Sequence, residues 1–319
     1  MQVILTEPEM PATMPSVSVV IPLFNESENL VRLIAALENA LESSESYDIL
    51  LVDDGSTDKS LETIRRLAEK NPQLRYISLT RNFGHQIALK IGLQHSVGQV
   101  VISMDADLQH PPEEIPRMIS AWRDGYKVVN MVRQLESASA FKRLTSSLFY
   151  RLVNSISDFE IVPGSSDFRL LDRSVVDVIN TLPEHCVFLR GMIPWLGYKQ
   201  TNLPFRPSER LHGDRKYRMF KMLQLAVTGI TSSSIRPLRI ATIIGVLTST
   251  AAAVYAIYAL IVKLVYGTAI SGWTSLLIGM MLLGGVQLLM LGVVGEYVGR
   301  VFVEVKGRPN GIVADSKLD

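Results

Sequence analysis

Two long apolar runs near the end of the chain constrain its fold more than any other feature. From Ile240 to Val265 the only charged residue is Lys263, and from Trp273 to Arg300 the only internal charge is Glu296. A helix needs about 20 apolar residues to cross a bilayer, and both runs exceed that length. We therefore expect two membrane-spanning helices.

The basic residues around these runs predict an orientation. The connection from Tyr266 to Gly272 carries no Lys or Arg, whereas the opposite ends are flanked by Arg236, Arg239, Arg300, Lys306 and Arg308. The positive-inside rule then predicts a multi-pass protein of the cell inner (plasma) membrane, with both termini in the cytoplasm. Residues 1–15 contain Glu7 and Glu9 and no apolar core, so they do not resemble a signal peptide.

Composition excludes some classes of protein. The net charge of the 319 residues is +1, which is too balanced for a nucleic-acid binder. Cys186 is the only cysteine, so an intramolecular disulfide is impossible and a reducing compartment fits. The mean hydropathy is +0.21 although 20% of the residues are charged, which places the apolar residues mainly after Ile240.

The part of the chain before the apolar runs alternates between two hydrophobic periods. Strands are predicted at residues 16–22, 47–52, 74–79, 100–104, 126–132 and 200–206, with helices between the first four and a turn at residues 190–198. Asn25 or Ser27 is expected to cap the first helix. Loops rich in Asp, Asn and Gly follow the strands, and this order is typical of a doubly wound parallel sheet.

A pair of carboxylates ends the fourth predicted strand. Asp105 and Asp107 follow the apolar run 100–104, and Pro111 and Pro112 then stop the strand and allow a helix to begin. Ligands of open α/β sheets bind at the carboxyl ends of the strands. Two neighbouring carboxylates favour a cation between them, and their oxygens suit Mg²⁺ or Mn²⁺ with substrate phosphates as further ligands. The alternative is a strand-end turn in which an Asp caps the next helix.

Four segments in order carry a family resemblance: VVIPLFNE at 19–26, LVDDGSTD at 51–58, RNFGH at 81–85 and MDADLQHPPE at 104–113. They resemble the nucleotide-sugar domain of inverting family 2 glycosyltransferases, which have the α/β GT-A (Rossmann-like) fold. Within that family the chain is similar to polyprenyl-phosphate glycosyltransferases, namely dolichol-phosphate mannose synthase and, more closely, bacterial bactoprenol-phosphate glucosyltransferases. The resemblance covers nearly the whole chain, including two C-terminal membrane helices.

The resemblance implies a reaction. It is the inverting transfer of one sugar, best matched by glucose from UDP-glucose, to undecaprenyl phosphate at the cytoplasmic membrane face, for lipopolysaccharide or cell-wall modification. A homotetramer is suggested in the same way. Two alternatives stay open: a transferase that uses another donor such as GDP-mannose, and a non-catalytic membrane protein that binds nucleotide-sugars.

The resemblance also assigns roles to residues. Metal binding falls to Asp105, Asp107 and Gln109, and catalysis to Asp105, Asp107 and Asp167, the last of which has a helix cap as its alternative role. The nucleotide-sugar is expected to contact Pro22, Phe24, Glu26, Asp54, Asp105, Ala106, Arg210 and Lys216. The loop at 210–217 resembles the family's Arg-x-x-Gly-x-Ser-Lys-Tyr segment, but Arg215 replaces the usual Ser.

A lipid phosphate needs a positive cradle at headgroup depth. Apolar and aromatic residues between Phe141 and Leu152 are spaced for an amphipathic helix with a basic polar face, which can lie on a membrane or pack on the protein's own core. Arg143 and Ser147 share one face of this helix. The candidate phosphate ligands are Arg133, Arg143, Ser147 and Arg210.

These assignments predict five segments. They are a flexible N-terminus at 1–15, the GT-A domain at 16–215, an amphipathic interface helix and linker at 216–239, two transmembrane helices within 240–302, and a cytoplasmic tail at 303–319.

Overall fold

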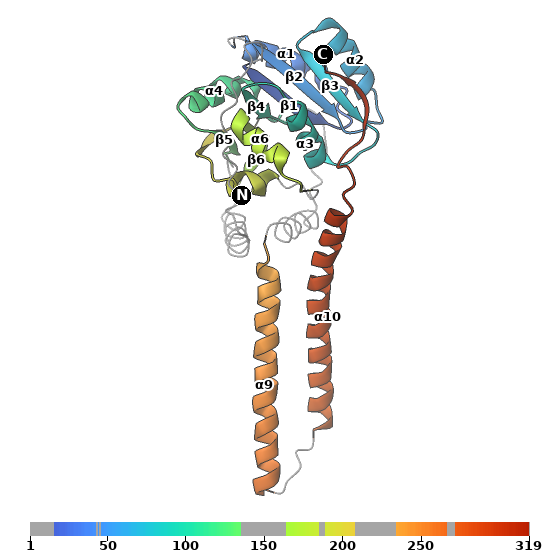
Figure 1. Cartoon of the computed structure of the whole chain (residues 1–319), viewed down its shortest axis with the longest axis vertical. Helices are drawn as coiled ribbons and strands as arrows, with labels where there is room; N and C mark the ends of the chain where they lie inside the picture. Colours follow the sequence, from blue (N-terminus) through green and yellow to red (C-terminus); the bar gives the residue numbers. More distant parts are fainter. Residues whose placement is uncertain are drawn as a thin grey trace. The chain divides into compact units, whose positions relative to one another are not determined.

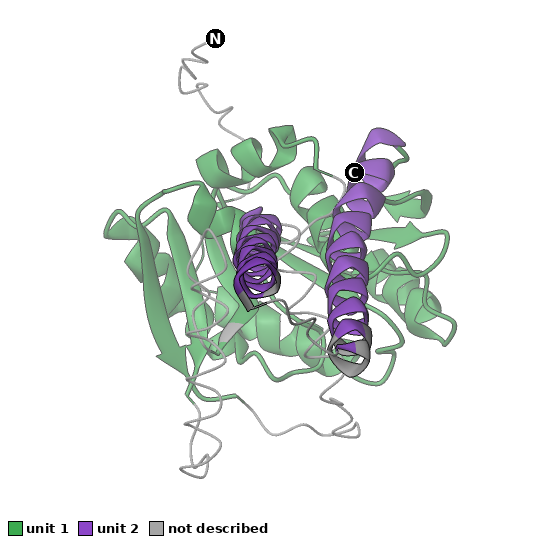
Figure 2. Ribbon diagram, turned by 90° about the horizontal axis from the view of Figure 1, so that it is seen from below, with its two compact units in different colours: residues 1–150, 159–216, 308–319 green, residues 151–158, 217–307 purple. Residues whose placement is uncertain are grey.

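The computed structural model describes residues 16–134 except 43 and 45, and residues 164–184, 189–207, 234–266 and 272–318. The chain forms two compact units (Figure 2). The first contains residues 1–150, 159–216 and 308–319, and the second contains residues 151–158 and 217–307. The last residues of the chain thus belong to the first unit.

A mixed eight-stranded sheet forms the first unit (Figure 1). Its strands are β1 (Val17–Leu23), β2 (Tyr47–Asp53), β3 (Leu74–Leu79), β4 (Val100–Ser103), β5 (Val128–Arg133), β6 (Ser165–Asp172), β7 (Gln200–Phe205) and β8 (Val313–Lys317). They lie in the order β7-β5-β6-β4-β1-β2-β3-β8. The neighbours β4-β1-β2-β3 are parallel as predicted, but β6 runs antiparallel to β4 and β5, and β8 runs antiparallel to β3. The parallel arrangement predicted for the first four strands is therefore confirmed, and β6 and β8 add antiparallel pairs on either side of them.

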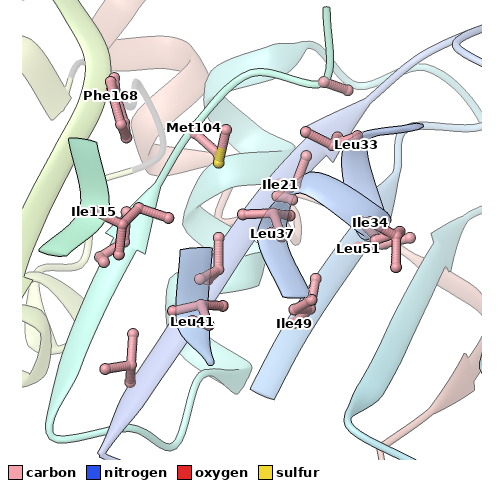
Figure 3. Packing of buried hydrophobic residues seen from close by; sticks show 14 of the residues in the cluster. Ile21, Leu33, Ile34, Leu37, Leu41, Ile49, Leu51, Met104, Ile115 and Phe168 are labelled. Atoms are coloured by element: carbon pink, nitrogen blue, oxygen red, sulfur yellow. The ribbon is translucent and has the colours of Figure 1, made fainter. Parts of the chain in front are cut away.

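One face of the sheet is covered by α1 (Leu30–Leu41), α2 (Ser60–Lys70), the 3₁₀ turn η1 (Pro112–Glu114) and α4 (Ile115–Arg123). In α1 the apolar residues recur every three or four positions, so one stripe of the helix is fully buried. Leu33, Ile34 and Leu37 pack over Ile21 and Ile49 (Figure 3). Each buried leucine of this kind contributes about 1.5–3 kcal/mol to stability.

The other face is covered by α3 (His85–His95), α6 (Arg173–Thr181) and α7 (Leu189–Trp195). Residues 189–195 were expected to form part of a turn, and they form a short helix because Leu189, Met192 and Ile193 are buried against this face. Residues of β6 alternate between the two faces, so Phe168 joins one core and Leu171 the other. Asp167 and Arg169 point to the same face as Leu171, toward α3 and α7.

Strand β8 comes from the end of the chain and was not predicted. It pairs with β3, and the carboxylate of Asp315 accepts hydrogen bonds from Arg65 and from the hydroxyl of Tyr76 at 2.7 and 3.0 Å. The carbonyl of Leu318 accepts a bond from Arg75 at 3.1 Å. These contacts cover the edge of β3, which would otherwise expose unpaired backbone groups.

The second unit contains the two helices predicted from the apolar runs, α9 (Arg236–Tyr266) and α10 (Trp273–Val305). Spans long and apolar enough to cross a membrane are Arg236–Val262 and Gly279–Val305, and their most apolar stretches are not buried inside the protein. The hydroxyl of Tyr297 in α10 donates to the carbonyl of Ser234, just before α9, at 2.6 Å. The apolar surface of these helices fits a membrane-associated protein.

Candidate functional site

The carboxyl ends of β1, β2 and β4 meet at one edge of the sheet, together with the beginning of β6. The first loop at this edge follows β1. Pro22 is buried within the strand. Its missing N–H is tolerated there because the ladder between β1 and β4 ends at Val20. Phe24 is 41% exposed, which leaves its ring accessible to a ligand. Glu26 is hydrogen bonded by the amide of Asn29 at 2.6 Å.

The loops after β1 and β2 are joined by Asn25. Its side-chain oxygen accepts from the backbone N–H groups of Thr57 and Asp58 at 2.8 and 3.3 Å. Asn25 therefore holds the β2 loop and does not cap α1, which begins at Leu30 after Asn29. Gly55 is required in the β2 loop, because its φ is +67° and a Cβ there would lie 2.4 Å from the backbone of Arg81.

Asp54 is buried beneath these loops. Its two carboxylate oxygens accept from the backbone N–H groups of Phe83 and Gly84 at 2.7 and 2.9 Å. Burial raises the pKa of Asp54 above its ordinary value, although these two bonds act in the opposite direction. Asp54 thus fixes the loop between β3 and α3. Its expected contact with a nucleotide base stays a prediction and must use the remaining lone pairs of the same oxygens.

The turn after β4 presents Asp105, Asp107 and Gln109. The Nδ1 atom of His110 accepts the backbone N–H of Asp105 at 2.9 Å, and Asp107 accepts the backbone N–H of Gln109 at 3.1 Å. Ala106 is buried within the turn, at 4% exposure. The turn is therefore preorganised by its own side chains.

His110 is a buried, neutral support for this turn. Its ring stacks on Phe168, with 5.1 Å between ring centroids, and meets the ring of Phe205 edge-on at 5.9 Å. Burial, together with the charge of Arg133, lowers the pKa of His110 to about 3. Because Nδ1 accepts a bond, the proton of the neutral ring is on Nε2, which lies 3.5 Å from Oδ2 of Asp105.

Asp105 has the character of a cation ligand. Its Oδ1 atom is buried and has no hydrogen-bond partner among the described residues, and burial raises the pKa of the carboxyl group. Such an atom is costly to bury unless a ligand satisfies it. Asp107 and Gln109 are half-buried and add a carboxylate and an amide oxygen to the same turn, so the residues fit a divalent cation of the Mg²⁺ or Mn²⁺ type. Within the described ranges no group of three His, Cys, Asp or Glu side chains is arranged to hold a metal ion.

Asp167 lies beside this turn at the start of β6 and is the centre of a buried ion-pair cluster. Arg190 of α7 donates to both of its oxygens, at 3.0 and 2.9 Å, and Arg169 donates at 3.3 Å. The amide of Gln86 in α3 donates at 3.0 Å. Burial alone would raise the pKa of Asp167, but the bond from His85 and the two arginines hold it well below its ordinary value. Asp167 does not cap a helix; Asp172 caps α6.

His85 connects the two carboxylates. Its Nε2 atom lies 3.4 Å from Oδ1 of Asp105 and 3.3 Å from Oδ2 of Asp167. Burial lowers the pKa of His85, but the bond to Asp167 and the two negative charges outweigh this effect and raise it overall. In its protonated form, the ring lowers the mutual repulsion of the two carboxylates.

Arg133 ends β5 on the far side of His110. Its backbone N–H donates to the carbonyl of Gly164 at 3.1 Å, and its Nε atom is buried without a partner in the described part of the chain. Its Nη2 atom is 3.4 Å from Nε2 of His110. The other residues expected to bind lipid phosphate or diphosphate lie outside the described residues: Arg143, Ser147, Arg210 and Lys216.

Sequence reasoning missed three members of the cluster, Gln86, Arg169 and Arg190. The feature that marks them is their shared hydrogen-bond partner, Asp167. Arg169 is two residues from it in the same strand, but Gln86 and Arg190 are 81 and 23 residues away along the chain, so only the fold brings these two within reach.

Comparisons with known proteins agree on the family. The model of Glycosyl transferase family 2 matches residues 18–179, and that of the GtrB C-terminal hairpin matches residues 236–301. The chain is 40% identical to the uncharacterized glycosyltransferase YkcC of Bacillus subtilis, over 94% of this chain and 93% of the relative. It is 38% identical to the prophage bactoprenol glucosyl transferase homolog of Escherichia coli, over 93% and 98%, and 39% identical to the bactoprenol glucosyl transferase of Shigella phage SfII, over 94% and 98%.

Among solved structures, the mannosyltransferase PcManGT of Pyrobaculum calidifontis, in complex with GDP-Man and Mn²⁺, aligns with 93% of this chain and 86% of its own. The TM-score is 0.47 and the identity 17%. The family matches and the curated relatives confirm the family resemblance that was inferred from the sequence motifs, and the GT-A fold class. The chain belongs to glycosyl transferase family 2 and is a glycosyltransferase.

Proposed function

We propose that the protein transfers one sugar from a nucleotide-sugar, with UDP-glucose as the first candidate, to undecaprenyl phosphate or a similar polyprenyl phosphate. The observation that carries this proposal is the juxtaposition of two groups at one sheet edge. One is Asp105, whose buried Oδ1 atom accepts no hydrogen bond from a described residue and lies 3.4 Å from the ring of His85, and the other is the ion-pair cluster around Asp167. A carboxylate turn suits a metal-bound donor diphosphate, and the neighbouring cations suit a second anion. Relatives named bactoprenol glucosyl transferases support the lipid acceptor.

The site residues divide between the two substrates. Phe24, Glu26 and Asp54 follow β1 and β2 and are assigned to the base and ribose of the donor. Asp105, Asp107 and Gln109 follow β4 and are assigned to the cation. Bound there, Mg²⁺ or Mn²⁺ would offset the charge that develops on the leaving nucleoside diphosphate.

The chemistry needs no strong general base. A phosphate monoester is largely an anion at neutral pH, because its second pKa is about 6. One of its oxygens attacks the anomeric carbon, the bond from that carbon to the donor diphosphate breaks, and the electron pair leaves with the nucleoside diphosphate. A single displacement of this kind inverts the anomeric centre. The protein contributes by orienting the two phosphate-bearing substrates and by supplying fixed charges.

The acceptor is a membrane lipid, so the catalytic unit is assigned to the cytoplasmic membrane face, with both termini in the cytoplasm. The one-sided distribution of Lys and Arg around α9 and α10 supports this orientation. The predicted amphipathic segment at 141–152, with Arg143 and Ser147, is assigned to the membrane surface together with Arg133 and Arg210. Arg210 and Lys216 are further assigned to the donor diphosphate, and a homo-oligomer is expected from the family resemblance.

A donor screen tests the proposal. Purified full-length protein in detergent is incubated with Mn²⁺, undecaprenyl phosphate and, one at a time, UDP-glucose, UDP-galactose, UDP-N-acetylglucosamine and GDP-mannose, and lipid-linked sugar is measured. UDP-glucose should give the highest turnover. Selective turnover of GDP-mannose would reassign the donor, and a lack of lipid product with every donor would overturn the proposal.

A further inference from the structure

We propose that Arg190 binds the phosphate of the lipid acceptor, held in place by Asp167 and Gln86. This inference rests on the proposed function and adds a binding residue to it. It starts from the ion-pair cluster, in which two guanidinium groups share the single carboxylate of Asp167. Two cationic groups thus face one buried carboxylate, and the ring of His85 lies between that carboxylate and Asp105.

Exposure separates the two arginines. The side chains of Asp167 and Arg169 are 4% and 5% exposed, whereas that of Arg190 is 41% exposed. Arg169 therefore acts inside the protein, beneath the site. Of these three side chains, only Arg190 presents a large part of its surface to solvent, and a guanidinium group matches the geometry of phosphate.

The orientation of Arg190 is fixed from below. Its Nε and Nη2 atoms are bound by the two oxygens of Asp167 at 3.0 and 2.9 Å, which sets the plane of the guanidinium group. Gln86 bridges the same elements, because its Nε2 donates to Asp167 at 3.0 Å and its Oε1 accepts the backbone N–H of Leu189 at 3.3 Å. One turn later on α3, the buried ammonium group of Lys90 donates to the carbonyls of Leu182 and Glu184, which precede α7, at 3.3 and 2.9 Å.

Strand order decides between the two phosphate-bearing substrates. Across the sheet edge the sequence is β2, β1, β4 and β6. The predicted base and ribose contacts follow β2 and β1, and the cation ligands follow β4. Asp167 and Arg190 come next, on the side of Asp105 away from the nucleotide, with His85 between the two carboxylates. The group that reaches the anomeric carbon from this side is the attacking phosphate of the acceptor.

The test measures binding, so that it does not depend on turnover. Full-length protein in detergent is titrated with farnesyl phosphate and, separately, with farnesol, which has the same chain and no phosphate. The dissociation constant of farnesol divided by that of farnesyl phosphate measures how much the phosphate group contributes to binding. Arg190→Ala should lower this ratio at least tenfold, while binding of UDP-glucose with Mn²⁺ changes less than twofold. Arg66→Ala, which removes an exposed arginine of α2, is the matched control and should change neither value.

Two further variants keep the test informative if Arg190→Ala unfolds. Arg190→Lys keeps the charge, but an ammonium group does not reproduce the fork to Asp167, so the ratio should fall at least threefold. Gln86→Met preserves the length of the side chain and removes both bridging bonds, so it should lower the ratio without weakening the binding of farnesol. If the role of these residues were purely structural, the variants would instead lower the melting temperature and weaken the binding of farnesyl phosphate, farnesol and UDP-glucose together.

The outcomes distinguish the inference from the proposed function. If Arg190→Ala and Arg190→Lys keep the preference for farnesyl phosphate while the wild-type enzyme transfers sugar, the inference is wrong and the function stands. If Arg190→Ala weakens the binding of UDP-glucose and not that of farnesyl phosphate, Arg190 belongs to the donor site and its assignment to the acceptor phosphate is also wrong. If the wild-type protein neither prefers the phosphate nor transfers sugar, both fail.

Discussion

Replacing Asp105 by Asn should stabilise the metal-free protein and abolish sugar transfer. Burial raises the pKa of this carboxyl group above its ordinary value of 3.8, the charge of His85 lowers it, and the charge of Asp167 raises it again. The net shift is upward, so the folded protein holds this proton more tightly than the unfolded chain does. Stability is therefore lost as the pH rises from the ordinary value through the raised pKa.

The expected magnitude follows from this sign. An amide has nearly the shape of a carboxylate but carries no charge, so Asp105→Asn removes the unfavourable burial of that charge. Substitutions that relieve such strain at a functional site commonly add about 1 kcal/mol. In a unit of roughly 200 residues this gain corresponds to an increase of about 2–4 °C in melting temperature.

Thermal unfolding in detergent at pH 7.5, with a chelator present, measures this effect. Asp58→Asn is the matched control with the opposite sign. Although burial raises the pKa of Asp58, hydrogen bonds from Ser60 and Ser27 outweigh it and lower the pKa, so the charged form stabilises the fold. Asp58→Asn should thus lower the melting temperature slightly. In a second arm, Mn²⁺ should raise the melting temperature of the wild type and leave Asp105→Asn unchanged.

The result that would refute this reasoning is a melting temperature of Asp105→Asn at least 2 °C below that of the wild type. The carboxylate would then be a structural group whose charge is satisfied inside the protein. A variant that keeps both turnover and its response to Mn²⁺ would remove Asp105 from the cation site.

Three further predictions concern the metal, the topology and the lipid. Asp107→Asn should abolish turnover and weaken Mn²⁺-dependent binding of nucleotide, because a charged ligand is lost; full activity of this variant with chelator present would exclude the metal. In a Cys186→Ser background, a cysteine at Thr268 should be labelled from outside the cell and one at Ser316 only from inside; the reverse pattern would overturn the orientation. Arg143→Ala should raise KM for polyprenyl phosphate or lower kcat more than tenfold, about 1.4 kcal/mol, and leave calorimetric binding of UDP-glucose unchanged; loss of nucleotide binding with an unaltered lipid titration would mean that the two sites were exchanged.

The strands that a local run of hydrophobic residues indicates were predicted well. β1 to β4 are buried parallel strands followed by loops that contain Asp, Asn or Gly, and their bounds agree with the prediction to within a residue. β8 could not be predicted in this way, because Val313–Lys317 is short and mainly exposed. Its place in the sheet depends on partners such as Arg65, 250 residues earlier in the chain.

In the candidate site too, some residues can be recognised from a local motif and others only from the fold. Asp105 and Asp107 can be recognised from the sequence, because a short motif at a strand end carries both. The functional setting of Asp167 cannot, because its partners Gln86 and Arg190 come from α3 and α7 and reach it only when those helices pack on one face of the sheet. His110 has the reverse character: it lies within the recognisable motif, yet the structure makes it a buried support for the turn.

The most direct test of the account is the structure of the lipid product. UDP-glucose, Mn²⁺ and farnesyl phosphate are incubated with the full-length protein, and the product is examined by mass spectrometry and by proton and phosphorus NMR. The expected product carries one glucose attached through its anomeric carbon to the lipid phosphate, in the β configuration that follows from inversion of an α-linked donor. An α-linked product, or glucose released without attachment to the lipid phosphate, would contradict this expectation.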